Sequence, residues 1–210
     1  RTLGLLRSLR RGFSGQQSRV QFIGGTPELV SNPRDVQLRG IRIQGNYSDL
    51  PNLIFFPDLF DQVENWVPYF TNPRNGILNY RNVYLLYPRN FGSSDWCNDA
   101  SNEHGENVAE DIERFMYQHK ITMATLGGHG FGAKNAMVLG TYRPHLVTGI
   151  LSYDYAPQDY TYFRVAATLR ELAKSVGDLA VKPFPKSEFE KVTNYLASKN
   201  ETIRNHEVHR

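Results

Sequence analysis

The sequence is poor in several features that mark particular classes of protein. It contains one cysteine, Cys97, so no disulfide can form within the chain. It has no run of the roughly 18 apolar residues that a membrane-spanning helix requires. It also shows no cysteine and histidine spacing of the kind that holds zinc, no internal repeat and no low-complexity tract. The sequence therefore predicts no disulfide framework, no membrane-spanning helix and no metal site.

The chain also lacks a large excess of charge of either sign. The formal net charge is +3, and lysine and arginine form no stripe interleaved with aromatic residues. Such a modest charge gives no basis for predicting a nucleic-acid partner. What the chain does have is apolar content, since 40% of its 210 residues are hydrophobic and it holds 12 tyrosines and 12 phenylalanines. That content is enough to build the core of one domain.

The first 19 residues differ in composition from the rest of the chain. They are rich in arginine, and the first acidic residue is Glu28. Leucines recur at helical spacing from Leu3 to Leu9. This composition is typical of a mitochondrial transit peptide, with an ordinary basic surface helix as the alternative. We predict a basic targeting-like extension over residues 1–30 and expect it, where retained, to lie against a partner subunit or an anionic membrane.

Strand and helix patterns alternate along the body of the chain. The expected strands are 53–56, 83–86, 121–126 and 147–153, and the expected helices cover 60–70, the segment around 108–116 and a segment opening near Ala133. Alternation within Val36–Ile43 further predicts two short strands or a bent hairpin. This order predicts an α/β fold with a mostly parallel sheet and helices on both faces. In such sheets the functional residues follow the carboxyl ends of the strands.

A glycine-rich turn follows the third of these expected strands. Its residues Gly128, His129, Gly130, Phe131 and Gly132 fit the nucleophile elbow pattern G-x-S-x-G, except that glycine replaces the serine. A glycine has no side chain that could attack a carbonyl carbon. Loss of the nucleophile alone lowers the turnover of a serine hydrolase by about 10⁶-fold.

The same turn has a second interpretation. Gly128, Gly130 and Ala133 match the dinucleotide fingerprint G-x-G-x-x-G/A, and Asp154 ends the next expected strand, where a ribose-binding carboxylate would lie. That fingerprint usually follows the first strand of its domain, whereas two or three expected strands come before this turn. A phosphate- or dinucleotide-binding module therefore stays open as an alternative, and the leading interpretation assigns no cofactor.

Several segments in order resemble one protein family. These are 56–61, 87–94, 128–135 and 153–157, each following an expected strand. They are similar to the corresponding loops of the α/β-hydrolase superfamily, in particular its mitochondrial and bacterial esterases of the "α/β-hydrolase domain-containing protein 11" kind. The resemblance runs from about Val36 to about Asn194. It implies an α/β-hydrolase-like domain over 31–210, truncated at the C-terminus, with a helical cap segment at about 157–200.

The chain departs from the family pattern at positions that serve catalysis. Gly130 stands at the serine position, Pro57 and Asp58 replace the His-Gly of the oxyanion loop, and Phe91 replaces a histidine. A carboxylate at Asp58 would repel a developing oxyanion. The resemblance places the family's catalytic Asp and His beyond Arg210. It therefore implies a degenerate serine hydrolase that is not an enzyme, a pseudoenzyme without catalytic residues.

Other candidate groups offer little chemistry. Cys97 lies near Asp95 and Asp99, whose charges would raise the pKa of its thiol and weaken it as a nucleophile. His129 flanks the elbow and is interpreted as structural. The tyrosines between Tyr153 and Tyr162 suit a pocket wall or a protein interface.

These observations lead to one functional hypothesis with three alternatives. We expect a non-catalytic accessory subunit of a large mitochondrial complex, the respiratory chain or ATP synthase. The alternatives are the dinucleotide- or phosphate-binding module, a subunit of the mitochondrial ribosome, and a residual esterase. The expected partners are other subunits of that complex, with peripheral membrane or lipid contact through the basic N-terminus. The expected location is the mitochondrion, on the matrix side or peripheral to the inner membrane.

Overall fold

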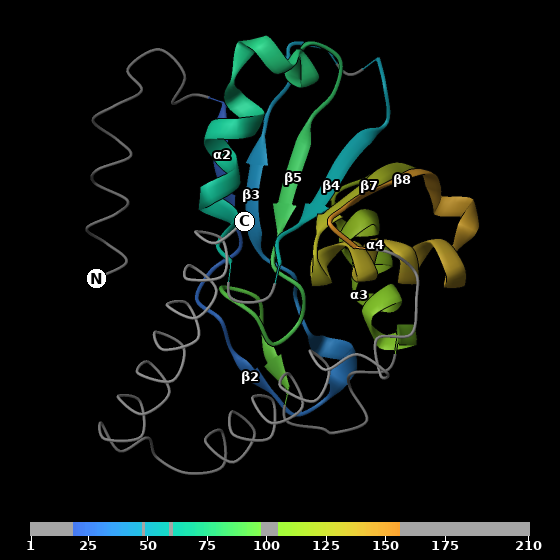
Figure 1. The fold of residues 1–210 in the computed structure, drawn as a ribbon. Coiled ribbons are helices and arrows are strands. Elements are labelled where there is room, and N and C mark those ends of the chain that lie inside the picture. The colour runs from blue at the N-terminus through green and yellow to red at the C-terminus, as the bar shows by residue number, and fades with distance from the viewer. Residues whose placement is uncertain (1–18, 48, 59–60, 98–104, 156–210) are drawn as a thin grey trace, which may run out of the picture. The chain divides into compact units, whose positions relative to one another are not determined.

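Six strands form one mixed sheet in the computed structural model, which describes residues 19–47, 49–58, 61–97 and 105–155 (Figure 1). The spatial order is β1 (Val20–Ile23), β3 (Gly40–Ile43), β5 (Val83–Leu86), β4 (Asn52–Phe56), β7 (Ala124–His129) and β8 (Val147–Tyr153). A separate pair joins β2 (Leu29–Val30) and β6 (Trp96–Cys97) in parallel. The chain divides between Pro157 and Gln158, and every described residue precedes that division.

The sheet is parallel where the sequence predicts it to be. Strands β5, β4, β7 and β8 run parallel, whereas β3 is antiparallel to β5 and β1 is antiparallel to β3. All four residues of β5 are buried, and so are the last four of β4. Such continuous apolar runs arise because helices cover both faces of a parallel sheet. The expected α/β fold is therefore confirmed.

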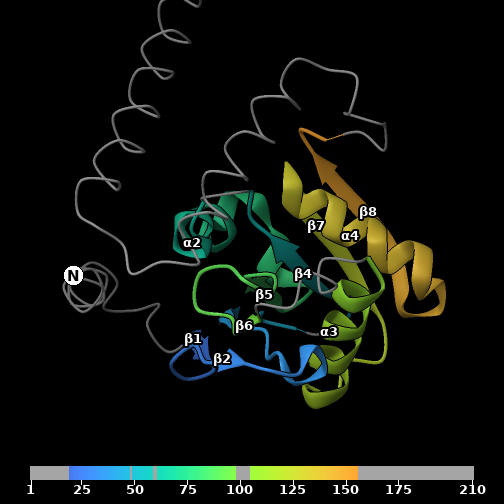
Figure 2. The same ribbon diagram turned by 90° about the horizontal axis from the view of Figure 1, so that it is seen from below.

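The helices lie on opposite faces of the sheet. Helix α2 (Val63–Thr71) covers one face, and helices α3 (Gly105–Gln118) and α4 (Phe131–Tyr142) pack together on the other (Figure 1, Figure 2). Short 3-10 turns occupy Pro33–Asp35, Pro73–Asn75, Ile77–Asn79 and Pro144–Leu146. Each face carries its own buried cluster. One lies between α2 and the sheet and includes Phe55 and Phe70, and the other lies beneath α3 and α4 and includes Phe56 and Leu126. None of the helices in the described residues is long and apolar enough to cross a membrane.

The chain changes direction across the sheet at β4. From β4 it passes to β5 on one side, and it then returns through α3 to β7 on the other side of β4. Ligands of open α/β sheets bind beyond the carboxyl ends of the strands at such a switch point. The turns that leave β4 and β7 are therefore where a site is expected.

Two segments differ from the sequence prediction. Val36 and Leu38 are buried but form no strand, because the backbone around them bonds to the 94–95 segment instead. Gln37 N–H donates to the Asp95 carboxylate at 3.0 Å, and Arg39 N–H donates to Ser94 Oγ at 2.8 Å. In addition, the strand expected at 121–126 starts only at Ala124, because the N–H of Ile121 donates to the Met116 carbonyl and closes the end of α3. In both places backbone hydrogen bonds outside the sheet thus override the local pattern.

Candidate functional site

The turn between β7 and α4 has the backbone of a strained elbow. Gly130 lies there at φ 52° and ψ −121°, in the left-handed half of conformational space that favours glycine. Its N–H donates to the carbonyl of Tyr153 at 2.9 Å, and its carbonyl accepts from Ala133 N–H at 3.1 Å. Two bonds therefore tie the turn to the end of β8 and to the first turn of α4.

The neighbouring glycines allow three backbone segments to approach closely. A Cβ added at Gly128 would lie 2.2 Å from the carbonyl carbon of Gly132, and one added at Gly132 would lie 2.2 Å from the carbonyl oxygen of Phe56. No side chain fits at such distances without moving backbone. Gly128 and Gly132 are thus required for packing the start of α4 against the ends of β4 and β7.

The loop after β4 places Asp58 directly over Gly130. A Cβ at Gly130 would lie 2.3 Å from both Cγ and Oδ1 of Asp58, so the carboxylate fills the space that an elbow side chain would occupy. Asp58 Oδ1 accepts a hydrogen bond of 2.7 Å from the N–H of Phe131, the first residue of α4. This arrangement is favourable because helix N-termini carry partial positive charge and free N–H groups.

An aromatic group lies beside the elbow. The rings of Trp66, His129 and Tyr153 have centroid distances of 5.6 Å, 5.3 Å and 6.4 Å, so each contacts the other two. Trp66 Nε1 donates to Asp61 Oδ2 at 2.8 Å. His129 Nε2 lies 3.9 Å from a carboxylate oxygen of Asp154, whose side chain is exposed. Apolar and ionisable groups therefore meet at one end of the sheet.

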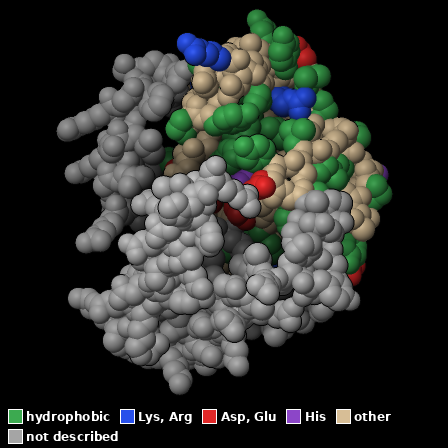
Figure 3. Space-filling model, in the orientation of Figure 1, with side chains coloured by type: hydrophobic (Ala, Val, Ile, Leu, Met, Phe, Trp, Pro, Cys, Tyr) green, Lys and Arg blue, Asp and Glu red, His purple; other side chains and the backbone are tan. Residues whose placement is uncertain are grey.

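Hydrogen bonds around Asp61 favour the charged form of its carboxyl group. Burial acts to raise the pKa of its carboxyl group, but hydrogen bonds from Asn65, Trp66 and the Gln62 N–H outweigh it and lower the pKa below its usual value. Figure 3 shows hydrophobic side chains gathered over the upper part of the described surface, with acidic and histidine side chains close together at their lower border. Carboxylates in this region disfavour an anionic substrate.

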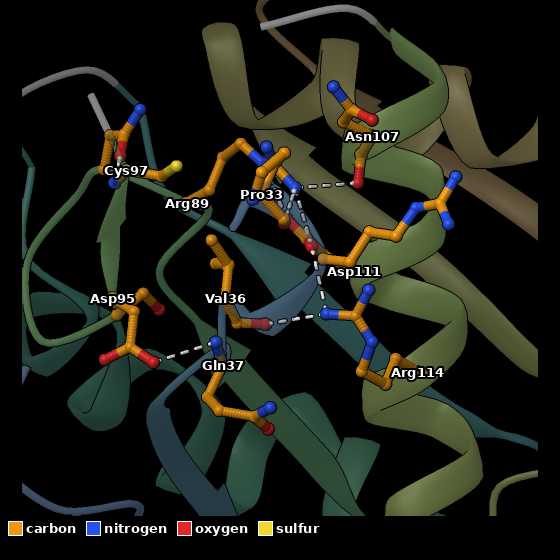
Figure 4. A network of polar contacts seen from close by, with 12 residues as sticks. Pro33, Val36, Gln37, Arg89, Asp95, Cys97, Asn107, Asp111 and Arg114 are labelled. Carbon is orange, nitrogen blue, oxygen red and sulfur yellow. Dashed lines mark hydrogen bonds and ion pairs between the residues drawn. The ribbon is translucent and has the colours of Figure 1, made fainter. Parts of the chain in front are cut away.

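The loop after β5 is fixed by buried ion pairs. Arg89 donates to both carboxylate oxygens of Asp111 on α3, at 2.6 Å and 2.8 Å, and it also donates to the carbonyls of Pro33 and Asn107 (Figure 4). Burial raises the pKa of Asp111 to about 6, against the lowering effect of Arg89. Arg39, which directly precedes β3, bonds the carboxylate of Asp95 in the same loop.

These bonds set the position of Phe91 relative to the elbow. Phe91 lies in the loop that Arg89 fixes, and its ring centroid is 6.5 Å from that of Phe131. Cys97 is buried in the core on the α3 and α4 face and does not belong to the site. The loop after β5 therefore adds an aromatic wall to the site.

The structure brings most of the residues singled out in the sequence to one place. Gly128, His129, Gly130, Phe131 and Gly132 form the elbow, and Ala133 and Asp154 border it. The dinucleotide alternative needs the N-terminus of α4 for a phosphate, but the Phe131 N–H there is bonded to Asp58. That alternative stays a prediction that the geometry does not favour. The segments 1–18 and 156–210, which hold most of the predicted targeting-like extension and the predicted cap segment, lie outside the described residues.

Two site residues were missed in the sequence. Asp61 and Trp66 were not identified, and Asp58 was interpreted only as a lost oxyanion loop. One signal was available, because an acidic residue directly after a buried parallel strand lies at the functional edge of such a sheet. The bond between Asp58 and Phe131 joins residues far apart in the sequence and leaves no local pattern.

Comparison with known proteins supports the fold. No family model matches the chain. It is 29% identical over 133 residues to sn-1-specific diacylglycerol lipase ABHD11 of Mus musculus, covering 60% of this chain and 41% of that protein. Among solved structures, a marine microorganism esterase shares 25% identity at a TM-score of 0.51, covering 67% of this chain and 49% of that one. The chain has the α/β-hydrolase fold.

Other solved structures, at lower sequence identity, match in shape alone. E-2-(acetamidomethylene)succinate hydrolase is 19% identical at a TM-score of 0.53, covering 73% of this chain and 51% of that one. Epoxide hydrolase A from Mycobacterium thermoresistibile is 14% identical at a TM-score of 0.53, covering 73% of this chain and 44% of that one. The chain thus spans about half the length of the proteins it matches.

One prediction from the sequence is wrong. The chain was predicted not to be an enzyme, as a degenerate serine hydrolase, whereas the proteins it resembles are a lipase, an esterase and other hydrolases. The prediction assumed that a hydrolase with glycine in place of the serine at position 130 has no enzymatic activity. That assumption does not hold, because serine is only one of several side chains that act as nucleophiles in enzymes. The absence of a serine is a fact of the sequence, but loss of activity does not follow from it.

The close approach of Asp58 to Gly130 predicts strong coupling between the two positions. We expect G130S alone to lower the free energy of unfolding by about 2–4 kcal/mol, from left-handed backbone strain and the displaced Asp58 hydrogen bond. In D58G/G130S the serine has room, so we expect about 1–3 kcal/mol of favourable coupling. Urea unfolding of both single variants and the double variant measures this. Additive effects would show that the two side chains do not compete for space.

Proposed function

We propose that this chain is the elbow-bearing part of a hydrolase whose reaction takes place where β4 and β7 end. One observation carries the proposal. The N–H of Phe131 holds a negatively charged oxygen, Asp58 Oδ1, at 2.7 Å, in the position from which elbow hydrolases stabilise an oxyanion. A backbone donor fixed at the start of a helix needs no reorganisation when charge develops near it.

The surroundings indicate the kind of substrate. Trp66, Tyr153, Phe91 and Phe131 supply aromatic surface around the elbow. Asp58, Asp61 and Asp154 lie near the same turn and would repel an anion. We therefore propose a neutral, largely apolar substrate. This agrees in character with the lipase and esterase to which the chain is similar.

A substitution that removes only the backbone donor tests the proposal. Phe131 is the first residue of α4, a position where proline is well tolerated, so F131P deletes the N–H while preserving the helix. F131A is the matched control, since it removes the ring and keeps the N–H. With 4-nitrophenyl butyrate and styrene oxide as substrates, we expect F131P to lower kcat about 10²- to 10³-fold relative to F131A.

Two results would overturn the proposed function. One is equal turnover in F131P and F131A, which would remove the N–H from the reaction. The other is the absence of any hydrolysis above the buffer rate by the unaltered chain, across both substrates. Thermal melting of each variant confirms that it is folded before the rates are compared.

We also propose a location and a class of partner. The basic composition before Glu28 supports a mitochondrial location, and the last strand supports assembly with other subunits. Among the described residues β8 pairs only with β7, its sequence has no charged residue, and Ile150, Leu151 and Tyr153 are exposed. An uncharged apolar edge strand readily pairs with another chain. We propose a respiratory-chain or ATP synthase complex as the assembly.

The size of the native particle tests this second proposal. In mild-detergent extracts of mitochondria from the source organism, we expect the chain to migrate with a complex far larger than itself. A Leu151→Lys variant, which charges the exposed strand, should be lost from that complex, whereas Tyr117→Lys on the exposed face of α3 should remain. A free monomer, or a chain outside mitochondria, would contradict the proposal.

A further inference from the structure

We propose that this chain has a second site, which binds a phosphate group between the guanidinium of Arg42 and the imidazole of His119. His119 lies between the end of α3 and the amino end of β7, whereas the elbow follows the carboxyl end of β7. The inference therefore goes beyond the proposed hydrolase function and does not depend on it. It starts from a buried hydrogen-bond donor that has no partner.

Arg42 is the third residue of β3 and lies directly opposite Tyr84 of β5, so both side chains are on the sheet face beneath α3. The guanidinium carbon of Arg42 is 5.9 Å from the centre of the Tyr84 ring. That ring attracts the charge but accepts no ordinary hydrogen bond from it. The Nε–H of Arg42 is buried without a hydrogen-bond partner. Burial of an unpaired guanidinium is costly, because the water that would solvate its charge is excluded.

His119 supplies a second group at the same place. Its ring centroid is 5.9 Å from that of Tyr84 and 4.3 Å from that of Phe115, so the imidazole and Arg42 share one aromatic surface. Burial lowers the pKa of His119, and the nearby charge of Arg42 lowers it further. The guanidinium therefore acts on the imidazole across a short distance, and the two repel each other when both are charged. An anion between them would turn that repulsion into attraction.

No acidic side chain neutralises these two groups in the part of the chain that the structure describes. The ion pairs found there do not include Arg42 or His119. The residues next to them are also not acidic, since Gln21 lies opposite Arg42 on β1, while Gln118 precedes His119 and Lys120 follows it. The end of α3 and the neighbouring strands thus present positive charge and amide groups without a counter-ion.

The charge and shape of these donors favour a phosphate group over a carboxylate. Phosphate on an ester carries a charge of about −1.5 to −2 near pH 7 and three strong acceptor oxygens. The guanidinium fork of Arg42 can bind two of those oxygens, which leaves the third for a protonated His119. A carboxylate has one charge and two oxygens, so it cannot give the fork both of its oxygens and also balance a charged imidazole.

Titration of the unaltered full chain with inorganic phosphate tests the inference without a substitution. The imidazole C–H signals of His119 are assigned by their loss in H119Q and followed by NMR against pH. A bound anion favours the imidazolium, so we expect phosphate to raise the pKa of His119, and we expect the signals of the exposed His145 not to respond. A His119 titration that phosphate leaves unchanged would overturn the inference.

The pH dependence of binding follows from the same linkage. Sulfate is the probe here, because its charge stays constant between pH 4 and 8. If binding raises the pKa of His119, the complex takes up a proton, so affinity is highest below the pKa of the free chain. Affinity then falls as pH rises through the higher pKa of the complex. In H119Q we expect this fall to be absent, and an equal fall in H119Q would contradict the role of the imidazole.

Substitution of Arg42 gives an independent readout by calorimetry. We expect R42Q to weaken phosphate binding about 10- to 100-fold, and R42K, which keeps the charge but not the fork, to lie between R42Q and the unaltered chain. R74Q is the matched control, since it removes the same charge from an exposed arginine beyond the end of α2. Equal weakening in R42Q and R74Q would indicate general attraction to a basic chain and overturn the inference. Thermal melting confirms that each variant is folded.

Vesicles distinguish the two sources of such a phosphate group. Phosphatidylcholine vesicles are prepared with and without phosphatidic acid, whose headgroup is a phosphate monoester. Sedimentation with the vesicles that requires phosphatidic acid and is weaker in R42Q than in R74Q would identify a lipid headgroup. Binding of inorganic phosphate without such sedimentation would identify a free phosphate-bearing ligand. Either result supports the site, whereas failure of both probes to bind would overturn it.

Discussion

Replacing Arg89 with alanine is expected to lower the free energy of unfolding by about 3–5 kcal/mol, since this leaves a buried carboxylate without its partner. The side chains of Arg89 and Asp111 are only 4% and 1% exposed. Arg89 also donates to two backbone carbonyls, so the substitution removes bonds to two segments, the 3-10 turn at Pro33 and helix α3. Equilibrium unfolding in urea at pH 8 measures the loss.

A second arginine provides the control for this prediction. Arg143 on α4 pairs with Glu113 on α3 at 2.7 Å, but these side chains are 25% and 40% exposed. R143A is expected to cost only about 0.2–1 kcal/mol, because exposed ion pairs contribute little. Similar losses in R89A and R143A would show that burial does not determine the strength of these pairs.

The loss in R89A is expected to depend on pH. Burial raises the pKa of Asp111 to about 6 in the folded chain, and removal of Arg89 takes away a group that lowers it. A folded-state pKa above the unfolded value means that the folded state binds more protons, so stability falls as pH rises through that pKa. R89A should therefore lie closer to the unaltered chain at pH 5 than at pH 8. A difference that grows on acidification would contradict this account.

The second large effect is expected at Gly132. G132A should lower the free energy of unfolding by about 3 kcal/mol, because its Cβ would lie 2.2 Å from the Phe56 carbonyl oxygen. That atom belongs to backbone at the end of a central strand and has no rotamer with which to move aside. We expect thermal unfolding to show the loss.

Gly149 is the matched control for Gly132. It lies in β8, and a Cβ there would meet only the methyl group of Thr125, at 4.0 Å. G149A should be neutral or slightly stabilising, since alanine restricts the unfolded chain more than glycine does. If G132A were as harmless as G149A, the close approach of α4 to the end of β4 would not exist in solution.

Some strands of the fold can be predicted from the sequence and others cannot. The runs at 53–56 and 83–86 form strands as expected, because buried parallel strands need continuous apolar residues. The run at 147–153 also forms the expected strand, although none of its residues is buried. The strand β1, by contrast, has only partly buried or exposed residues and was not predicted. Its place is set by pairing with β3, and an edge strand leaves little pattern in the sequence.

The residues of the candidate site also differ in whether the sequence reveals their role. The glycines of the elbow are visible in the sequence because a tight strand-to-helix turn needs them locally. The role of Asp58 is not visible, since it depends on a hydrogen bond to a residue much later in the chain. The Arg89–Asp111 pair is hidden for the same reason. Local constraints are readable from residue types, whereas contacts between distant segments are not.

The competition between Asp58 and Gly130 for one space restricts the order in which substitutions could accumulate. A serine at 130 beside an aspartate at 58 is costly at the observed distances, so a chain that carries both is disfavoured. An intermediate with a small residue at each position avoids that cost. Substitution at one of these positions therefore alters which residues the other can accept.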